Sequence, residues 1–165
     1  MSEIQNGEQP VLKYEKIGGW LIVVAFGLVV TPVRLLFFVI HDIVPVFSGE
    51  AWSILTTPGT EAYHPLWAPL LIFELVTNIA FSVFAIILSV FFFQRRMCAP
   101  RWMIVYLLSN AAFVGTDYFV GNMIPAITSQ KDVESMTELA RTAVAACIWV
   151  PYFLVSKRVK GTFLR

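Results

Sequence analysis

The chain has 165 residues, of which 58% are hydrophobic and only 14% are charged, with a formal net charge of +1. An average soluble domain is about 45–50% apolar and ~25% charged, so this composition excludes an ordinary soluble protein. Four apolar segments follow one another, and three of them exceed the ~20 residues that a helix needs to cross a bilayer. Because they lack the alternation of barrel strands, we predict an all-α, polytopic membrane protein built as an antiparallel four-helix transmembrane bundle.

The hydropathy pattern divides the chain into three regions. Residues 1–16 are polar and form a predicted cytoplasmic N-terminal tail, followed by a first apolar stretch that is too long for a signal peptide. Residues 17–156 form the predicted transmembrane domain, with helices at about 17–40, 67–93, 101–127 and 137–156. Residues 157–165 form a basic cytoplasmic C-terminal tail. An even number of spans is consistent with both tails on one side.

Positive charge is distributed unevenly over the connections. Lys and Arg residues outside the spans lie before the first helix, between the second and third helices and after the fourth. Residues 42–66 contain no Lys or Arg, and residues 128–139 contain only Lys131. By the positive-inside rule, both termini are expected in the cytoplasm and the two larger connections outside.

The connection between the first two helices, residues 41–66, is too apolar for a plain tether. Within it we expect residues 48–55 to form a short interfacial helix, with Ser48 as its N-cap and Trp52 at headgroup level. The connection is therefore expected to act as a loop that caps the outer end of the bundle.

Four ionisable side chains lie in or at the ends of the four apolar segments, one in each: Arg34, Glu74, Asp117 and Arg141. A rise of ~1.5 Å per residue puts Glu74 roughly 10 Å below the outer edge and Asp117 roughly 24 Å from the inner edge of a ~30 Å core. The same count places Arg34 and Arg141 at a similar depth in the membrane. An unpaired charge costs about 2.5–3.5 kcal/mol at a helix centre, so we predict buried Arg–carboxylate pairs among the four.

A second polar layer is expected beneath this charged layer. Asn78 lies one turn from Glu74, and Asn110 lies two turns from Asp117, in each case on the same helix face. The six side chains form a candidate cluster with two open interpretations. It either binds a polar ligand or handles protons, or its ion pairs set helix register and specify a partner.

Metal and cofactor motifs are lacking in the sequence. His41, Asp42 and His64 are weak candidates for a zinc site on the outer side, because imidazole nitrogens and carboxylate oxygens bind zinc, but they lack ligand spacing. No Gly-rich phosphate loop, nucleophile elbow or H-E-x-x-H motif is present. We therefore expect no metal, no cofactor, no catalytic residue and no nucleic-acid partner.

Several short motifs resemble a known family. They are Ile17-Gly18-Gly19-Trp20-Leu21, Thr57-Pro58-Gly59, Tyr63-His64-Pro65-Leu66-Trp67, Phe73-Glu74-Leu75 with Asn78, Trp149-Val150-Pro151-Tyr152-Phe153, and residues 156–163. Together they resemble the bacterial integral-membrane family called domain of unknown function 2569, over about Ile17 to Phe163. The resemblance implies a four-helix, multi-pass protein of the bacterial inner membrane, and it brings no activity.

These observations lead us to expect a non-enzymatic inner-membrane protein that acts as an accessory subunit or as a small-ligand-binding bundle through its charge cluster. The expected partners are the lipid bilayer, a membrane-protein partner or a second copy of the chain, and a small polar ligand from the outer side. Two alternatives stay open, namely a small oligomeric proton-coupled transporter and an intramembrane enzyme.

Overall fold

The computed structural model describes residues 17–128 and 133–163 of the chain, so the tail predicted for residues 1–16 lies outside this part, as do the last two residues of the C-terminal tail. Within the described ranges the protein is helical and has no strand. Its elements are α1 (Trp20–Phe38), the π-helical turn η1 (Val39–Ile43), α2 (Val44–Ser48), α3 (Glu50–Thr56), α4 (Trp67–Phe93), α5 (Ala99–Gly121), α6 (Pro125–Thr128), α7 (Val133–Val155) and α8 (Lys157–Thr162).

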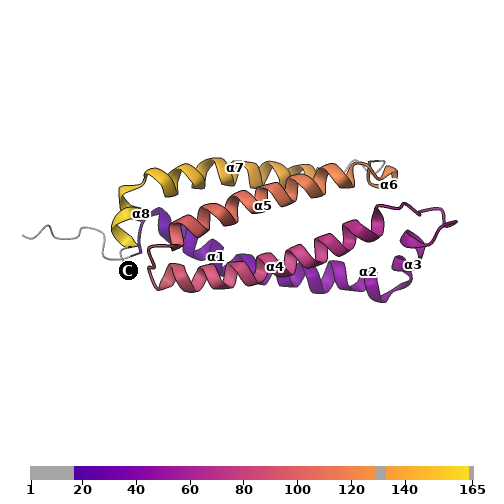
Figure 1. The fold of residues 1–165 in the computed structure, drawn as a ribbon, viewed down its shortest axis with the longest axis horizontal. Coiled ribbons are helices and arrows are strands. Elements are labelled where there is room, and N and C mark those ends of the chain that lie inside the picture. Colours follow the sequence, from indigo (N-terminus) through magenta and orange to yellow (C-terminus); the bar gives the residue numbers. More distant parts are fainter. Residues whose placement is uncertain (1–16, 129–132, 164–165) are drawn as a thin grey trace, which may run out of the picture.

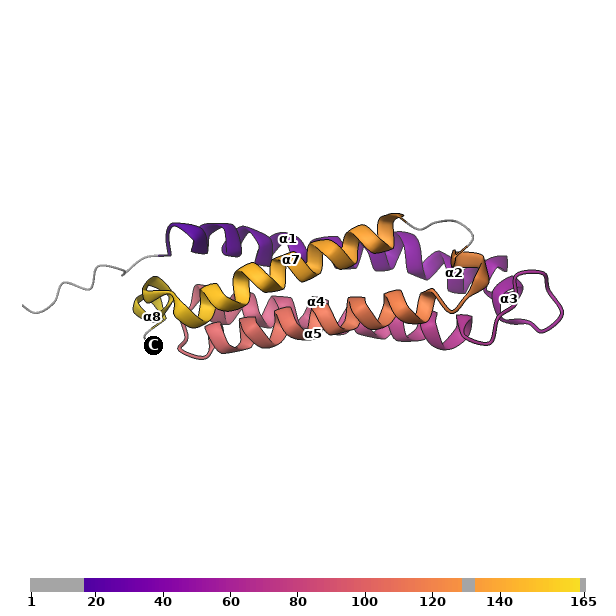
Figure 2. The ribbon, with the colours of Figure 1, turned by 90° about the horizontal axis from the view of Figure 1, so that it is seen from above.

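Four helices of the described residues are long and apolar enough to cross a membrane: Trp20–Ser48, Trp67–Phe93, Ala99–Gly121 and Ser135–Val155. They lie lengthwise side by side, with close packing of α1 on α4, of α4 on α5 and of α5 on α7 (Figures 1 and 2). We call the two ends of the bundle the α8 end, which also holds the α4–α5 turn, and the α3 end, which also holds α2 and α6. The predicted all-α membrane protein with four spans is confirmed.

The first span is longer than predicted, because residues 41–48 continue the helix instead of starting a loop. Pro45 has no N–H, and its ring crowds the carbonyl of the preceding α-helical turn. The helix widens into η1 just before this proline, and the Val44 N–H donates to the Val39 carbonyl, five residues back. Such π-type widening is one of the ordinary ways in which a helix absorbs a local conflict.

The short helix expected in the outer connection is present as α3, but Ser48 does not cap it. The Ser48 hydroxyl donates to the Val44 carbonyl at 3.2 Å on the preceding helix, and Gly49 holds the N-cap position of α3. The third span ends at Gly121, earlier than predicted. Pro125 begins the separate helix α6, and a proline disfavours helical backbone in the residue before it, so the third span does not continue into residues 122–127.

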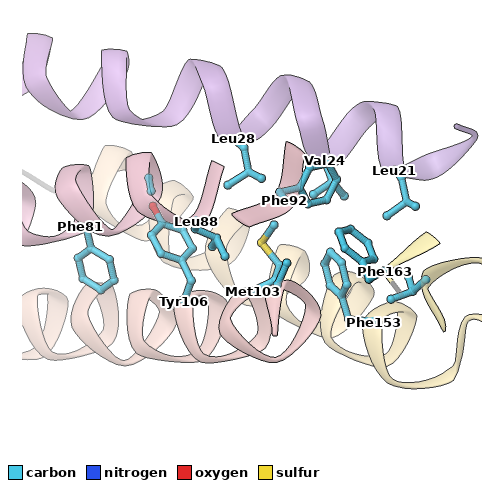
Figure 3. Close-up of a cluster of buried hydrophobic side chains, with 13 residues drawn as sticks. Leu21, Val24, Leu28, Phe81, Leu88, Phe92, Met103, Tyr106, Phe153 and Phe163 are labelled. Atoms are coloured by element: carbon cyan, nitrogen blue, oxygen red, sulfur yellow. The ribbon is translucent and has the colours of Figure 1, made fainter. Parts of the chain in front are cut away.

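Apolar packing is concentrated in the half of the bundle toward the α8 end (Figure 3). The buried cluster consists of Leu21, Val24, Leu28, Phe81, Ala85, Leu88, Phe92, Ala99, Met103, Tyr106, Phe153, Val159 and Phe163. Phe92 is completely buried, and its ring lies 5.2 Å from that of Phe163, which follows α8. On α1, α4 and α5 the cluster stops near the middle of each helix. The other half also buries apolar side chains, namely Val39, Ile43, Leu70, Leu71 and Ile124, and polar side chains lie among them.

Pro32 lies inside α1 and deprives the Leu28 carbonyl of its usual helical donor. The Ser89 hydroxyl of α4 reaches this carbonyl at 3.2 Å, and it also donates to the Ala85 carbonyl of its own helix at 2.7 Å. Serine side chains commonly satisfy the backbone groups that proline frees in membrane helices. This hydrogen bond therefore joins α1 to α4 at the level where α1 would otherwise be weakest.

The start of α1 and α8 are far apart in the sequence but meet at the α8 end. Gly19 has a φ of 59°, and a Cβ atom placed there would lie 2.7 Å from Nη1 of Arg158. Ser156 caps α8 by accepting a hydrogen bond from the Val159 N–H at 3.4 Å. The glycine thus provides both the backbone conformation and the space that let the Arg158 guanidinium lie against the first turn of α1.

Replacing Gly19 with Ala is expected to lower the free energy of unfolding by about 1–3 kcal/mol, because its backbone conformation is nearly restricted to glycine and the methyl group would collide with Arg158. Unfolding in detergent, followed by circular dichroism, measures the change. Gly27→Ala is the matched control, since nothing lies within 4 Å of a Cβ atom at Gly27. Equal stability of the two variants would contradict the contact with Arg158.

Candidate functional site

Aromatic contacts set the alignment of α4 and α5. The ring pairs are Phe84 with Trp102 at 6.0 Å, Phe81 with Tyr106 at 5.5 Å, and Phe73 with Phe113 at 5.4 Å. Separations of this size are typical of favourable edge and tilted ring contacts. Each successive pair moves toward the α3 end on both helices, so α4 and α5 run in opposite directions and the residues that face each other can be read along the seam.

Glu74 and Asp117 lie on either side of the Phe73–Phe113 ring pair in this α4–α5 seam, Glu74 toward the α8 end and Asp117 toward the α3 end. Glu74 directly follows Phe73, whereas Asp117 lies one helical turn beyond Phe113, the ring partner of Phe73. Both side chains are half-buried, and the charge of Asp117 acts on Glu74. Two like charges repel strongly where the surroundings are of low dielectric constant. A charge on one of these carboxyl groups therefore disfavours a charge on the other.

The two asparagines continue the polar part of the seam toward the middle of the bundle. Asn78 is buried, and its Nδ2 donates to the Glu74 carbonyl at 2.9 Å, one turn away on the same helix. Asn110 is half-buried and lies two turns from Asp117 on the same face of α5. Just beyond them Phe81 and Tyr106 begin the apolar cluster. In the half of the seam toward the α3 end, polar side chains thus lie next to the Phe73–Phe113 ring pair.

The two arginines meet a carboxylate that the predicted cluster does not contain. Nη2 of Arg34 lies 3.1 Å from Oε1 of Glu138, and Nη1 of Arg141 lies 3.5 Å from Oε2 of the same residue. Among the residues that the structure describes, neither arginine pairs with Glu74 or Asp117. The side chains are 58% exposed for Arg34, 67% for Arg141 and 36% for Glu138. The prediction of buried pairs among Arg34, Glu74, Asp117 and Arg141 is therefore corrected: the two arginines form partly exposed pairs with Glu138.

Glu138 is missing from the predicted cluster because it is counted with the outer connection, residues 128–139, although it also falls at the start of the predicted fourth helix, 137–156. In the structure α7 begins at Val133, so Glu138 already belongs to the helix. It precedes Arg141 by three residues, a spacing that puts both side chains on one helix face. That spacing is the sequence signal by which Glu138 can be recognised as a member of the charged layer.

The outer histidines make local contacts. The His41 ring stacks on Phe37 with a centroid distance of 4.1 Å, whereas Nδ1 of His64 accepts a hydrogen bond from the Leu66 N–H at 3.3 Å. Within the described part of the chain, no three His, Cys, Asp or Glu side chains come together in a way that could hold a metal ion. The weak zinc candidates, the two histidines and Asp42, thus find no support in the geometry.

A double-mutant cycle distinguishes the observed pairing from the predicted one. Arg34→Gln and Glu138→Gln are expected to show a coupling energy of about 0.2–1 kcal/mol, the range for partly exposed ion pairs. Arg34→Gln and Glu74→Gln are expected to be additive within ~0.5 kcal/mol, because these side chains do not pair. The measurement is unfolding in detergent. A larger coupling of Arg34 to Glu74 than to Glu138 would overturn the assignment.

Comparison with known proteins places the chain in a family. The profile of the family described as "Protein of unknown function (DUF2569)" matches residues 14–164. The inner membrane protein YdgK of Escherichia coli (strain K12) is 29% identical over 152 residues, which cover 91% of this chain and 94% of that protein. Its name agrees with the inner-membrane localisation expected from the sequence, and no solved structure matches the chain. The resemblance seen in the sequence is therefore confirmed, and the chain belongs to the DUF2569 family of proteins of unknown function.

Proposed function

We propose that this protein is a non-enzymatic ligand-binding protein of the bacterial inner membrane, in which Glu74 and Asp117 together bind a small monovalent cation. In the proposed orientation the α8 end faces the cytoplasm and the α3 end faces the periplasm. This orientation is supported by the basic residues at the α8 end, namely Arg95, Arg96, Arg101, Lys157 and Lys160. A ligand from the periplasm would then reach the carboxyl pair first.

The proposal rests on the separation of the two arginines from Glu74 and Asp117. Because Glu138 pairs with both arginines, Glu74 and Asp117 share their part of the seam without an arginine partner among the described residues. Glu74 lies roughly 10 Å along α4 from its first residue at ~1.5 Å per residue, which is within the outer third of a ~30 Å core. Carboxyl groups at such a depth commonly mark ion and ligand pathways. A bound cation would relieve their mutual repulsion.

Carbodiimide modification of the two carboxyl groups in lipid nanodiscs tests the proposal, because a bound cation should shield them from the reagent. Sodium or methylammonium ions, each titrated separately, are expected to slow the modification of Glu74 and Asp117 about tenfold, which corresponds to roughly 1.4 kcal/mol of protection. Peptide mass spectrometry identifies the modified residue. Glu74→Gln is expected to abolish the protection of Asp117, because one carboxyl group is then missing from the site.

Glu61→Gln is the matched control, since Glu61 is an exposed acid near the α3 end and lies outside the seam. This variant should retain the protection seen in the wild type. Modification rates that neither cation changes would contradict the proposal, as would protection of Asp117 that persists in Glu74→Gln.

Proton-coupled transport is a second candidate, favoured by the asparagine layer. Asn78 and Asn110 extend the polar positions of the seam from the carboxyl pair toward the middle of the membrane, a continuation that a surface binding site would not need. Proteoliposomes with a trapped pH-sensitive dye are expected to show proton flux that is lost in Asp117→Asn and retained in Glu61→Gln. Cation protection without any flux would reject this candidate and leave the binding function standing.

A further inference from the structure

A groove lies between α1 and α4, in the half of the bundle toward the α8 end. Its volume is about 480 Å³, and it is lined by Leu28, Val29, Pro32, Ile86, Ser89, Val90, Phe93 and Gln94. Leu28 and Pro32 are buried and Ser89 is half-buried, so these three form its floor, whereas the larger apolar side chains around them are exposed. The small side chain of Ser89 leaves the space between these larger neighbours. The groove therefore opens toward the lipid and is apolar along most of its length.

The groove begins at the membrane surface and reaches about as deep as one leaflet. Gln94 is the C-cap of α4, and Ile86 lies eight residues deeper, which is about 12 Å at ~1.5 Å per residue. The hydrocarbon of one leaflet is about 15 Å deep. With its 27 residues α4 is about 40 Å long, enough to reach both headgroup regions of a bilayer that is ~40–45 Å thick. Gln94 thus lies at headgroup level, and the apolar part of the groove matches one acyl chain in depth.

A guanidinium group is held at the mouth of the groove. Nε of Arg96 donates to Oε1 of Gln94 at 2.8 Å, and Gln94 lines the groove. The Arg96 guanidinium also lies 5.1 Å from the centre of the Phe91 ring, within the range of a cation–π contact. These two contacts position the side chain although Arg96 is exposed. A guanidinium has five N–H groups and the contact with Gln94 uses one, so Arg96 can also bind phosphate oxygens.

The membrane surface at this mouth is positively charged. Residues 94–101 and 156–165 contain seven Lys and Arg residues and no Asp or Glu. The segment before α1, residues 1–19, adds only three Glu residues and two Lys residues. The excess of positive charge therefore holds wherever these N-terminal side chains lie. Clustered Lys and Arg residues next to a membrane span attract anionic lipids, by about 1 kcal/mol for each positive charge near the surface.

We propose that the α1–α4 groove binds one acyl chain of an anionic phospholipid from the leaflet at the α8 end, with the lipid phosphate on the guanidinium of Arg96. The acyl chain runs from Gln94 past Val90 to the floor at Pro32. A helix of a second copy would also fill an apolar groove, but it would leave the positive charge at the mouth unused, so charge complementarity favours the lipid. The site is independent of Glu74 and Asp117, which lie in the other half of the bundle.

Native mass spectrometry of the full chain tests this site, with phosphatidylglycerol and phosphatidylcholine offered in equal amounts. Phosphatidylglycerol is expected to remain bound to the wild type about tenfold more often, a preference equivalent to roughly 1.4 kcal/mol. The reason is that phosphatidylcholine carries a positive group beside its phosphate, which the basic surface repels. Arg96→Gln should remove this preference. Arg101→Gln is the matched control, because Arg101 is an exposed arginine at the same end, on α5, and does not line the groove.

A second pair of variants tests the groove without changing any charge. Val90→Phe fills the groove and should lower the retention of phosphatidylglycerol about tenfold. Val76→Phe makes the same change in the opposite half of α4 and should retain the lipid, since both valines are exposed, at 47% for Val90 and 59% for Val76.

Three results would overturn the proposal. The first is a preference that persists in Arg96→Gln or is lost equally in Arg101→Gln, because general attraction to positive charge would then explain it. The second is displacement of the lipid by inorganic phosphate, which would make the site one for a soluble anion. The third is retention that Val90→Phe leaves unchanged, or a dimer that this variant disrupts, since the acyl chain would then not occupy the groove.

Discussion

Apolar side chains from all four spans and from α8 meet in one cluster at the α8 end, and this packing determines where the polar groups of the protein can lie. Lipid tails are as apolar as these side chains, so close packing and hydrogen bonds, more than exclusion of water, hold membrane helices together. The contacts of Phe92 with Phe163 and of Gly19 with Arg158 join distant parts of the chain at this end. The half of the bundle toward the α3 end buries apolar side chains outside this cluster, such as Ile43, Leu71 and Ile124, and polar side chains lie among them.

The ionisable side chains of the spans form two separate groups among the described residues. A charge in hydrocarbon needs a counter-charge, a ligand or water. Among the described residues, Glu138 contacts both Arg34 and Arg141, between α1 and α7. Glu74 and Asp117 place two carboxyl groups in the α4–α5 seam. The described side chains thus do not form the self-neutralising cluster of four that the residue types alone suggest.

Several of the segments that carry the family resemblance make structural contacts near helix ends. Gly19 makes room for Arg158, and Trp67 stabilises the entry to α4 by donating its indole N–H to the Ala62 carbonyl at 3.2 Å. Glu74 and Asn78 differ from these contact residues, because they are polar side chains within an otherwise apolar packing face of α4. The packing of helix ends explains the contact residues without reference to a ligand. It explains a half-buried carboxyl group such as Glu74 much less readily.

The sequence by itself determined that the protein is helical and crosses a membrane, and it singled out Arg34, Glu74, Asp117 and Arg141 as ionisable side chains of the four apolar segments, one in each. These features follow from hydropathy and from the constant rise of a helix, which both depend on nearby residues only. The ends of two helices nevertheless differ from the prediction near prolines. The first span continues through Pro45 by way of a π-helical turn, whereas α5 ends at Gly121, before Pro125. Only the tertiary structure decided that the arginines meet Glu138 and that the other two carboxyl groups share the α4–α5 seam without them. The partner of a side chain depends on its direction around the helix axis and on which helix lies beside it, and neither is encoded in the position of that residue along its own span.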